Sequence, residues 1–318
     1  MKILIAYDGS GYSRNSLDDL RRAGLPDKAE AVLISISEVW LRAKIGGSGN
    51  DAAHDNEILD YIRIHSEQID RNLAETNDVL IEARTELQDH FPGWTIKVES
   101  AIGSPAQMIL QRSAALRPDL IVIGPRGLSS ASRSGLGSIA QNVISYTPFS
   151  VRISRGGPAS DTDQQKIVIC FDGSPCSVEA VDTVALRNWH GHPEVRLLVV
   201  TDPLDALIPG RAFRVVPGIP ENRTRGEEKW AKALAERALC TLRDAGLTAS
   251  MQTYSGNPRI ILVNESHEWK ADAIFVGMNS RRSHWLGCVA SAVASRSSCS
   301  VEIISRKVTD ASGDKWKQ

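Results

Sequence analysis

The sequence lacks an excess of either charge: its 318 residues include 37 basic and 38 acidic side chains, for a formal net charge of −1. Proteins that bind nucleic acid or anionic membranes through electrostatics carry a clear basic excess, so this balance argues against both partners. The sequence also lacks any apolar run near the roughly 18 residues of a membrane-spanning helix. Its opening residues pass straight into a strand-like run and contain no signal-peptide core. We therefore expect a soluble, cytoplasmic protein.

Cysteine is scarce and confined to the second half of the chain. The five cysteines are Cys170, Cys176, Cys240, Cys288 and Cys299. Their number is odd and no two form a C-x-x-C pair, so we expect reduced, mostly buried thiols in place of a disulfide framework or a zinc site. The pair His190 and His192 has no cysteine or acidic residue at ligand spacing nearby, and we interpret it as a surface turn. No metal-ligating side chains are predicted.

An internal repeat organises the chain. A short apolar run ending in a turn occurs twice, as Lys2-Ile-Leu-Ile-Ala-Tyr-Asp8-Gly-Ser10 and as Lys166-Ile-Val-Ile-Cys-Phe-Asp172-Gly-Ser174. The apolar, aromatic, Asp, Gly and Ser positions coincide at a constant offset, which also matches Ser13 to Ser177. Such a match indicates an internal duplication. We expect one domain over residues 1–155, a polar linker, a second domain over residues 166–306, and a disordered tail over residues 307–318.

Both halves alternate strand-like and helix-like segments. The strands expected after each opening run cover residues 31–36, 94–98, 120–123 and 149–153 in the first half, and 195–200, 249–254, 273–276 and 300–304 in the second. The expected helices cover residues 13–23, 56–90, a segment starting at 103–105, 139–143, 177–187 and 227–245. Residues 203–225 form an insertion with no structure assigned. This alternation predicts an α/β fold: two tandem, doubly wound, Rossmann-like domains, each a parallel sheet covered by helices on both faces.

A glycine-rich loop follows the apolar run at residues 120–123. It reads Gly124-Pro-Arg-Gly127, then nine residues, then Gly137-Ser138, where a stretch with helical spacing begins. A helix start suits phosphate binding, because its backbone N–H groups lack partners and it carries partial positive charge. Glycines let the backbone turn and approach a ligand closely. The simpler alternative is an ordinary strand–helix connection that binds nothing.

Several of these residues should meet at one edge of the sheet. In parallel α/β sheets a ligand sits at the carboxyl ends of the strands, which is where Asp8, Ile36, Gly103 and Gly124 fall. Asp8 also has a structural interpretation, since Asp before Gly commonly caps the turn that follows. Its duplicate Asp172 lies in the half without an intact loop, so both roles stay open.

Three features together resemble the nucleotide-binding pattern of the universal stress protein family: the Asp-Gly-Ser turn, the Gly103-Ser-Pro105 segment and the G-x-x-G-(nine)-G-S loop. The resemblance covers two copies of an adenine-nucleotide alpha-hydrolase-like domain, and nearly the whole chain apart from the insertion and the tail. Nucleotide-binding members of the family hold ATP in this crevice. The resemblance therefore implies an adenine nucleotide, ATP, ADP or AMP, with a Mg²⁺ or Mn²⁺ ion bridging its phosphates.

The resemblance also implies which residues hold the nucleotide. The matching positions are Asp8, Ile36, Gly124, Arg126, Gly127, Gly137, Ser138 and Ile139. Asp8 and the backbone at Ile36 would contact adenine and ribose, and residues 124–127 the ribose and first phosphate. Residues 137–139 would offer amides and a hydroxyl to the outer phosphates, with positive charge nearby from Arg126 and Arg133.

The second copy of the loop departs from this pattern. It reads Gly277-Met-Asn-Ser280, six residues, then Gly287-Cys288. Serine replaces the second glycine, cysteine replaces the helix-start serine, and the loop is three residues shorter. A β-carbon restricts the backbone and a thiol is a weak hydrogen-bond partner. We expect the second half to keep the fold and to lose the phosphate site, binding another small ligand or only pairing with the first half.

Three functions remain open. The first is a regulatory nucleotide-binding stress protein, the second a slow ATPase, and the third a non-nucleotide small-ligand-binding or scaffolding protein. No Walker A motif and no pair of general base and nucleophile stand beside the loop, so no catalytic residues are predicted. Because family domains commonly pair through their last strands, the resemblance implies an internal pseudo-dimer through residues 150–153 and 300–303, with a homodimer as a further option. Such pairing would cover two sheet edges.

Overall fold

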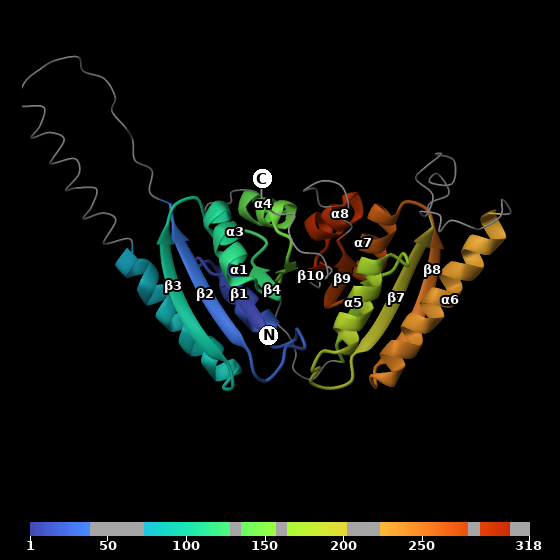
Figure 1. Cartoon of the computed structure of the whole chain (residues 1–318), viewed down its shortest axis with the longest axis horizontal. Coiled ribbons are helices and arrows are strands. Elements are labelled where there is room, and N and C mark those ends of the chain that lie inside the picture. Colours follow the sequence, from blue (N-terminus) through green and yellow to red (C-terminus); the bar gives the residue numbers. More distant parts are fainter. Residues whose placement is uncertain (39–72, 128–134, 157–163, 202–222, 279–286, 306–318) are drawn as a thin grey trace, which may run out of the picture. The chain divides into compact units, whose positions relative to one another are not determined.

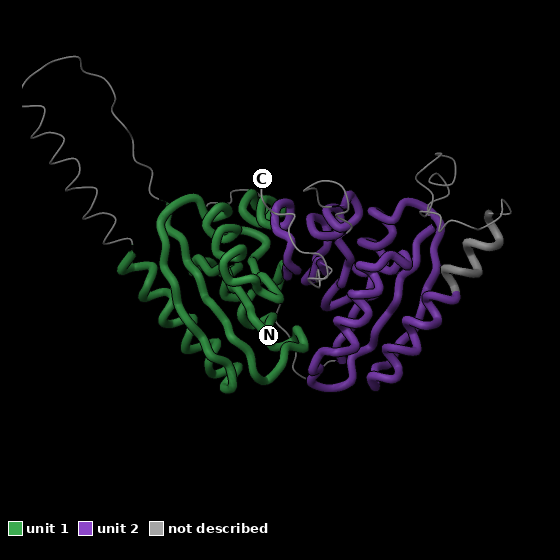
Figure 2. Tube along the Cα trace, in the orientation of Figure 1, with its two compact units in different colours: residues 1–143, 153–157 green, residues 144–152, 158–318 purple. Residues whose placement is uncertain are grey.

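A computed structural model describes residues 1–38, 73–127, 135–156, 164–201, 223–278 and 287–305 of the chain. These residues group into two compact units (Figure 2). Unit 1 comprises residues 1–143 and 153–157, and unit 2 comprises residues 144–152 and 158–318. Residues 144–152 therefore come from the first repeat of the sequence and belong to unit 2 in space.

Unit 1 alternates strands and helices along a parallel sheet (Figure 1). Its elements are β1 (Lys2–Ala6), α1 (Gly11–Leu20), β2 (Glu30–Ser37), a helix at residues 73–90, β3 (Thr95–Ile102), α3 (Pro105–Leu116), β4 (Leu120–Ile123) and the start of α4 (Ser138–Tyr146). The strands lie in the order β3-β2-β1-β4, and neighbouring strands are parallel. The central strands are nearly continuous apolar runs because helices cover both of their faces.

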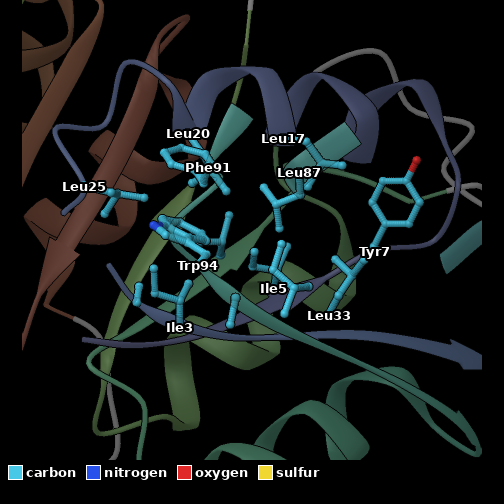
Figure 3. Close-up of a cluster of buried hydrophobic side chains, with 14 of the residues drawn as sticks. Ile3, Ile5, Tyr7, Leu17, Leu20, Leu25, Leu33, Leu87, Phe91 and Trp94 are labelled. Atoms are coloured by element: carbon cyan, nitrogen blue, oxygen red, sulfur yellow. The ribbon is translucent and has the colours of Figure 1, made fainter. Parts of the chain in front are cut away.

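The core of unit 1 lies between the sheet and two helices, α1 and the helix at residues 73–90 (Figure 3). Ile5, Leu17 and Leu87 contribute one fully buried side chain from β1 and from each helix. Phe91 and Trp94 stack with ring centroids 4.0 Å apart, and the Trp94 indole N–H donates to the Pro26 carbonyl at 2.8 Å. Helix α3 takes no part in this cluster and contacts β1 and β2. Both faces of the sheet are therefore covered.

Unit 2 repeats the pattern. Its elements are β5 (Ser150–Ile153), β6 (Lys166–Cys170), α5 (Pro175–Ala185), β7 (Glu194–Thr201), α6 (Arg223–Asp244), β8 (Thr248–Ser255), α7 (Pro258–Glu268), β9 (Ala273–Gly277), α8 (Cys288–Arg296) and β10 (Ser300–Ile304). The strands lie in the order β5-β10-β9-β6-β7-β8. Helices α5 and α6 pack on one core, whereas α7 and α8 contact each other together with β7 and β10. The predicted doubly wound α/β fold is confirmed.

The boundaries of several elements differ from the sequence prediction. Helix α1 begins at Gly11 and not at Ser13, because Ser10 is its N-cap. Strand β3 continues to Ile102, beyond the predicted end at residue 98. His190 and His192 are exposed on either side of Gly191, whose φ is +88°, so the predicted surface turn is confirmed. Residues 56–72 of the predicted long helix, most of the insertion and the predicted tail lie outside the described residues.

Among the described residues, no helix combines the length and the apolar composition that a bilayer span requires.

Candidate functional site

The turn after β1 is held by Asp8 and Ser10. Asp8 Oδ1 accepts a hydrogen bond from the Ser10 amide at 3.0 Å, and Ser10 Oγ accepts one from the Ser13 amide at 3.2 Å. Gly9 between them has a φ of +75°, a conformation that glycine adopts without strain. The Asx turn and the N-cap together fix the start of α1.

Unit 2 carries the same turn with the same bonds. Asp172 Oδ1 accepts from the Ser174 amide at 2.9 Å, and Ser174 Oγ accepts from the Ser177 amide at 3.2 Å. The structural interpretation of the repeated motif is therefore confirmed in both copies. Asp8 therefore has a structural role in the turn, whatever role it has toward a ligand.

The second carboxylate oxygen of Asp8 faces the glycine loop. A β-carbon built on Gly127 would lie 2.7 Å from Asp8 Oδ2, a distance that real β-carbons do not show. The turn after β1 and the loop after β4 therefore meet at the carboxyl edge of the sheet. Glycine at position 127 lets the loop backbone approach the carboxylate more closely than a residue with a β-carbon could.

The first glycine of the loop has a packing role. Gly124 is buried at the end of β4, where a β-carbon would come within 3.3 Å of the Arg126 carbonyl oxygen and 3.5 Å of Ser16 Oγ. Its counterpart Gly277 is more crowded, since a β-carbon there would lie 2.7 Å from the carbonyl carbon of Cys176. A glycine at this position thus permits a close approach of strand and helix in both units.

Arg126 ties the two ends of the nine-residue segment together. Its guanidinium donates to the Gly135 carbonyl, from Nε at 3.2 Å and from Nη2 at 3.0 Å. A third N–H donates to the Tyr12 hydroxyl at 3.3 Å, and the Arg126 Cζ lies 5.7 Å from the centroid of the Tyr12 ring. The Gly137 amide completes the closure by donating to the Pro125 carbonyl at 2.8 Å.

The loop opens onto the start of α4. The Gly137 carbonyl oxygen is the first acceptor of the helix, and the Gln141 amide donates to it at 3.0 Å. Ser138 is exposed and Ile139 half-buried in the first turn, where amides have no acceptor within the helix. A β-carbon on Gly137 would lie 3.4 Å from the Arg126 Cα, so this glycine also sits tightly against the loop.

The remaining predicted residues lie farther along the same edge or outside the described chain. Ile36 is half-buried near the end of β2, next to β1, and it pairs in register with Ala101. The Gly103 amide donates to the Ser37 carbonyl at 3.1 Å, so Gly103 closes the end of the neighbouring strand. Arg133 lies outside the described residues. The structure thus brings Asp8 and the two halves of the glycine loop together, with Ile36 one strand away.

Tyr12 was missed by the sequence analysis. It lies 43% exposed in the first turn of α1 and contacts Arg126 through its hydroxyl and ring. Its equivalent in the second repeat is Cys176. An exposed aromatic residue two positions after the N-cap, replaced in the copy with the degenerate loop, was the available signal.

Tyr7, next to Asp8, is buried at the edge of the core, with its hydroxyl pointing away from Ile5 (Figure 3). Burial raises the pKa of Tyr7, and a hydrogen bond from Arg14 partly opposes that shift. Tyr7 therefore stays neutral at physiological pH and adds no charge to the crevice.

The corresponding loop end in unit 2 is open. Helix α8 begins at the exposed Cys288, and its N-cap Gly287 makes no side-chain cap bond. Within the part of the chain that the structure describes, a β-carbon on Gly287 would meet no atom within 4 Å, in contrast to Gly137. Ser280 lies outside the described residues.

One further group of potential metal ligands lies away from the glycine loop. Asp18 of α1 lies near Glu86 and His90 of the helix at residues 73–90, with ligand atoms within 4.8 Å of one another. Asp18 is exposed, and exposed acidic groups of this kind are common without an ion.

The comparison with known families decides the identity. The model of the universal stress protein family matches residues 1–155 and again residues 164–305. The chain belongs to the universal stress protein family. A universal stress protein of Thermus aquaticus, encoded in the QAH/OAS sulfhydrylase 3′ region, is 31% identical over 159 residues, which are 48% of this chain and 97% of that relative. This universal stress protein therefore holds two copies of a unit that also occurs singly.

Two solved structures share the tandem fold. A universal stress protein from Archaeoglobus fulgidus aligns over 96% of this chain and 98% of its own, with 18% identity and a TM-score of 0.62. A functionally unknown protein from Pseudomonas aeruginosa aligns over 95% of this chain and 92% of its own, with 14% identity and a TM-score of 0.58. At these identities the likeness concerns the fold alone.

Proposed function

We propose that unit 1 of this universal stress protein binds an adenine nucleotide, with ATP as the first choice, as a regulatory or structural ligand. The observation that carries the proposal is the close approach of Gly127 to Asp8: a loop backbone held against a carboxylate, closed by Arg126 and leading into a helix start. This approach is possible only because position 127 has no β-carbon. These features suit a nucleotide, which has a polar nucleoside end and an anionic end.

Charge assigns the two ends of the nucleotide. Asp8 would repel phosphate and would accept hydrogen bonds from ribose hydroxyls or an amine, so the nucleoside end belongs beside it. The first turn of α4 offers the amides of Ser138 and Ile139 and positive partial charge to the phosphates. The Gly137 amide donates to the Pro125 carbonyl, so Gly137 would contribute by letting the backbone approach closely. Arg126 is engaged by Gly135 and Tyr12. We therefore assign it to holding the loop closed while its charge lies near the first phosphate.

A divalent ion, Mg²⁺ or Mn²⁺, belongs to the same proposal. It would be held chiefly by the phosphate oxygens, which are hard ligands, and would offset their charge. The Ser138 hydroxyl is the one protein oxygen that we would place near it.

The second unit enters the proposal as a degenerate copy. Its Asx turn and its packing glycine are intact, whereas the start of α8 has an open Gly287 and a cysteine in place of Ser138. The alternative is that the whole chain has a non-nucleotide small-ligand or scaffolding function. In its favour, the nucleotide proposal already gives unit 2 a function of this kind. A slow ATPase is the second alternative. It is less well supported, because Asp8 is the one carboxylate that the described residues bring against the loop, and its Oδ1 is engaged by the Ser10 amide.

The proposal also includes a cytoplasmic location and a dimer-like arrangement of the two repeats. No disulfide joins the cysteines of the described chain, as suits a reducing compartment.

Nucleotide content tests the proposal. Whatever copurifies with the protein is released and identified by mass, and the protein is titrated calorimetrically with ATP, ADP and AMP in the presence of MgCl₂. We expect about one adenine nucleotide per chain, tighter binding with each added phosphate, and loss of binding in Gly137→Asp, whose carboxylate would face the phosphates. The matched control is Gly287→Asp at the equivalent open position, where Asp is a favourable N-cap.

Each outcome has a clear meaning. Two nucleotides per chain, or loss of binding in the Gly287→Asp variant, would disprove the degenerate second site. No copurified nucleotide together with no heat of binding would favour the scaffolding alternative. Release of ADP and phosphate by the wild type, reduced in Gly137→Asp, would favour the ATPase.

A further inference from the structure

Unit 2 buries a cluster of three charged side chains that the nucleotide proposal does not use. Arg152 of β5 and Glu302 of β10 are the two charged residues in the fully buried class within the described chain. Arg152 Nη1 lies 3.2 Å from Glu302 Oε2, with both side chains 1% exposed. Arg187, at the end of α5, forms a second ion pair with Glu302 Oε1, and its Cζ lies 5.4 Å from the Phe275 ring centroid. We name Arg152, Arg187 and Glu302 the charge triad.

The two residues that face each other are equivalents in the duplication. Strand β5 reads Ser150-Val-Arg-Ile153 and strand β10 begins Ser300-Val-Glu-Ile303, so Arg152 and Glu302 hold the same position of the repeat. Ser305 contacts the other end of β5, donating from its amide to Ser150 Oγ at 3.0 Å and from Oγ to the Pro148 carbonyl at 2.5 Å. Residue 302 thus contacts residue 152, whereas the later residue 305 contacts the earlier residues 148 and 150. The two strands therefore run antiparallel. An approximate twofold axis therefore passes through the Arg152–Glu302 pair.

An axis at this place constrains which strands can pair. If two copies of β5 from different chains paired in this register, two Arg152 guanidinium groups would face each other and each would lose Glu302. If two copies of β10 paired, two Glu302 carboxylates would face each other and each would lose Arg152. Like charges directly opposite on a strand pair are destabilising, and buried charges without their partners cost far more than exposed ones.

Burial makes the electrostatic interactions within the charge triad strong. Burial lowers the pKa of Arg187, the attraction of Glu302 opposes that shift, and Arg152 adds a repulsion. Glu302 thus serves both arginines with its two oxygens. An apolar pair at positions 152 and 302 would have filled the same space without any preference for partner, and replacing buried ion pairs by apolar residues is often neutral or stabilising.

We propose that the charge triad selects the pairing partner of β5: it accepts β10, the unlike strand of the same chain, and rejects a second β5 or β10 from another copy. The duplication produced two strands with nearly the same sequence, and a difference of charge at the axis position makes them complementary to each other and not to themselves. Specificity of this kind combines an attraction for the right partner with a repulsion of the wrong ones. It is independent of whether unit 1 binds a nucleotide.

The first test compares variants of the full chain by hydrogen exchange at residues 150–153 and 300–304. Arg152→Met removes the charge and keeps the length of the side chain, whereas Arg152→Glu places two carboxylates opposite each other. We expect exchange in Arg152→Glu to be on the order of tenfold faster than in Arg152→Met, because repulsion adds to the lost attraction. Inverting the whole triad, Arg152→Glu with Glu302→Arg and Arg187→Glu, restores every opposite-charge contact and should slow exchange again.

The second test asks the partner question directly. Arg152→Glu makes both β5 and β10 acidic at the paired position, and Glu302→Arg makes both basic, so each variant loses its internal match while the two together are complementary. We expect their co-expression to yield a two-chain species containing one copy of each variant, seen by native mass spectrometry. Each variant expressed alone should form no two-chain species.

Three results would overturn the proposal. The first is equal exchange in Arg152→Glu and Arg152→Met, and the second is an inverted triad that exchanges as fast as Arg152→Glu. The third is a co-expression that gives no mixed two-chain species, or gives no more of it than the two-chain species that each variant forms alone. If a single reversal fails to fold, the inverted triad and the co-expressed pair still decide, because both restore the charge match.

Discussion

Asp8 and Gly127 lie against each other at the carboxyl ends of β1 and β4, so closely that a β-carbon on Gly127 would come within 2.7 Å of Asp8 Oδ2. Most of the first repeat separates the two residues in sequence. Their contact joins the Asx turn that caps α1 to the loop that leads into α4. The proposed nucleotide site depends on this single approach more than on any other.

Alanine at position 127 should therefore disturb unit 1 through Asp8. We expect Gly127→Ala to cost about 1–3 kcal/mol of unfolding free energy, the usual range for overpacking, and to weaken nucleotide binding. Because the crowding atom belongs to a side chain, adding Asp8→Ala should relieve the crowding at the cost of the Asx turn. The double variant should therefore lose less stability than the two single losses added together, and it should not recover the binding. Urea denaturation and calorimetry on the two single variants and the double variant would measure this. Strictly additive stability losses would contradict the contact.

Unit 2 offers a contrasting case, in which the crowding atom belongs to the backbone. A β-carbon on Gly277 would lie 2.7 Å from the Cys176 carbonyl carbon and 2.8 Å from the Ser177 amide nitrogen. We expect Gly277→Ala to cost about 1–3 kcal/mol with no rescue by a side-chain change at Cys176. The matched control Gly287→Ser, whose new β-carbon would meet no atom of the described residues within 4 Å and whose hydroxyl suits an N-cap, should stay within about 0.5 kcal/mol of the wild type or be slightly more stable in thermal and urea unfolding. Equal costs at the two positions would refute the packing role.

Arg126 should act as the closure of the glycine loop. Removing its contacts with Gly135 and Tyr12 in Arg126→Ala should speed hydrogen exchange at residues 135–137 several-fold, as expected from a loss of about 1 kcal/mol. Tyr12→Phe is the finer control, since it removes the hydroxyl acceptor and keeps the ring beneath the guanidinium. We expect it to have less than half of the effect. Exchange that is unchanged in Arg126→Ala would show that Gly137 and Pro125 hold the loop without it.

The cysteines should differ sharply in reactivity. Cys170 is buried in β6, and burial, together with the negative charge of Asp172, raises the pKa of its thiol. The reactive thiolate is therefore disfavoured, and we expect Cys170 to resist alkylation at pH 8 until the protein unfolds, while the exposed Cys240 and Cys288 react. Raising the pH to 9.5 should still leave Cys170 protected, because its pKa is raised. Peptide mass mapping checks this, and labelling of native Cys170 at the rate of Cys240 would contradict it.

Much of the architecture could be predicted because its signals are local. Apolar runs, turn residues and the duplicated Asp-Gly-Ser motif identify the strands, the helix starts and the two copies. Even the errors were local: Ser10 and Ser13 are both plausible caps, and the hydrogen bonds of the folded turn choose Ser10. The family resemblance drawn from the same motifs is confirmed, whereas the nucleotide, its ion and the domain limits stay predictions.

The sequence by itself determined the duplication, the alternation of strands and helices, and the presence of one intact and one altered glycine loop, since each of these is written in spacing and residue type along the chain. Only the tertiary structure decided that Gly127 touches Asp8, that Tyr12 meets Arg126, and that Arg152 of the first repeat is buried against Glu302 of the second. Those contacts join residues that are far apart in the chain. Their existence depends on strand order and helix packing, which local spacing does not encode.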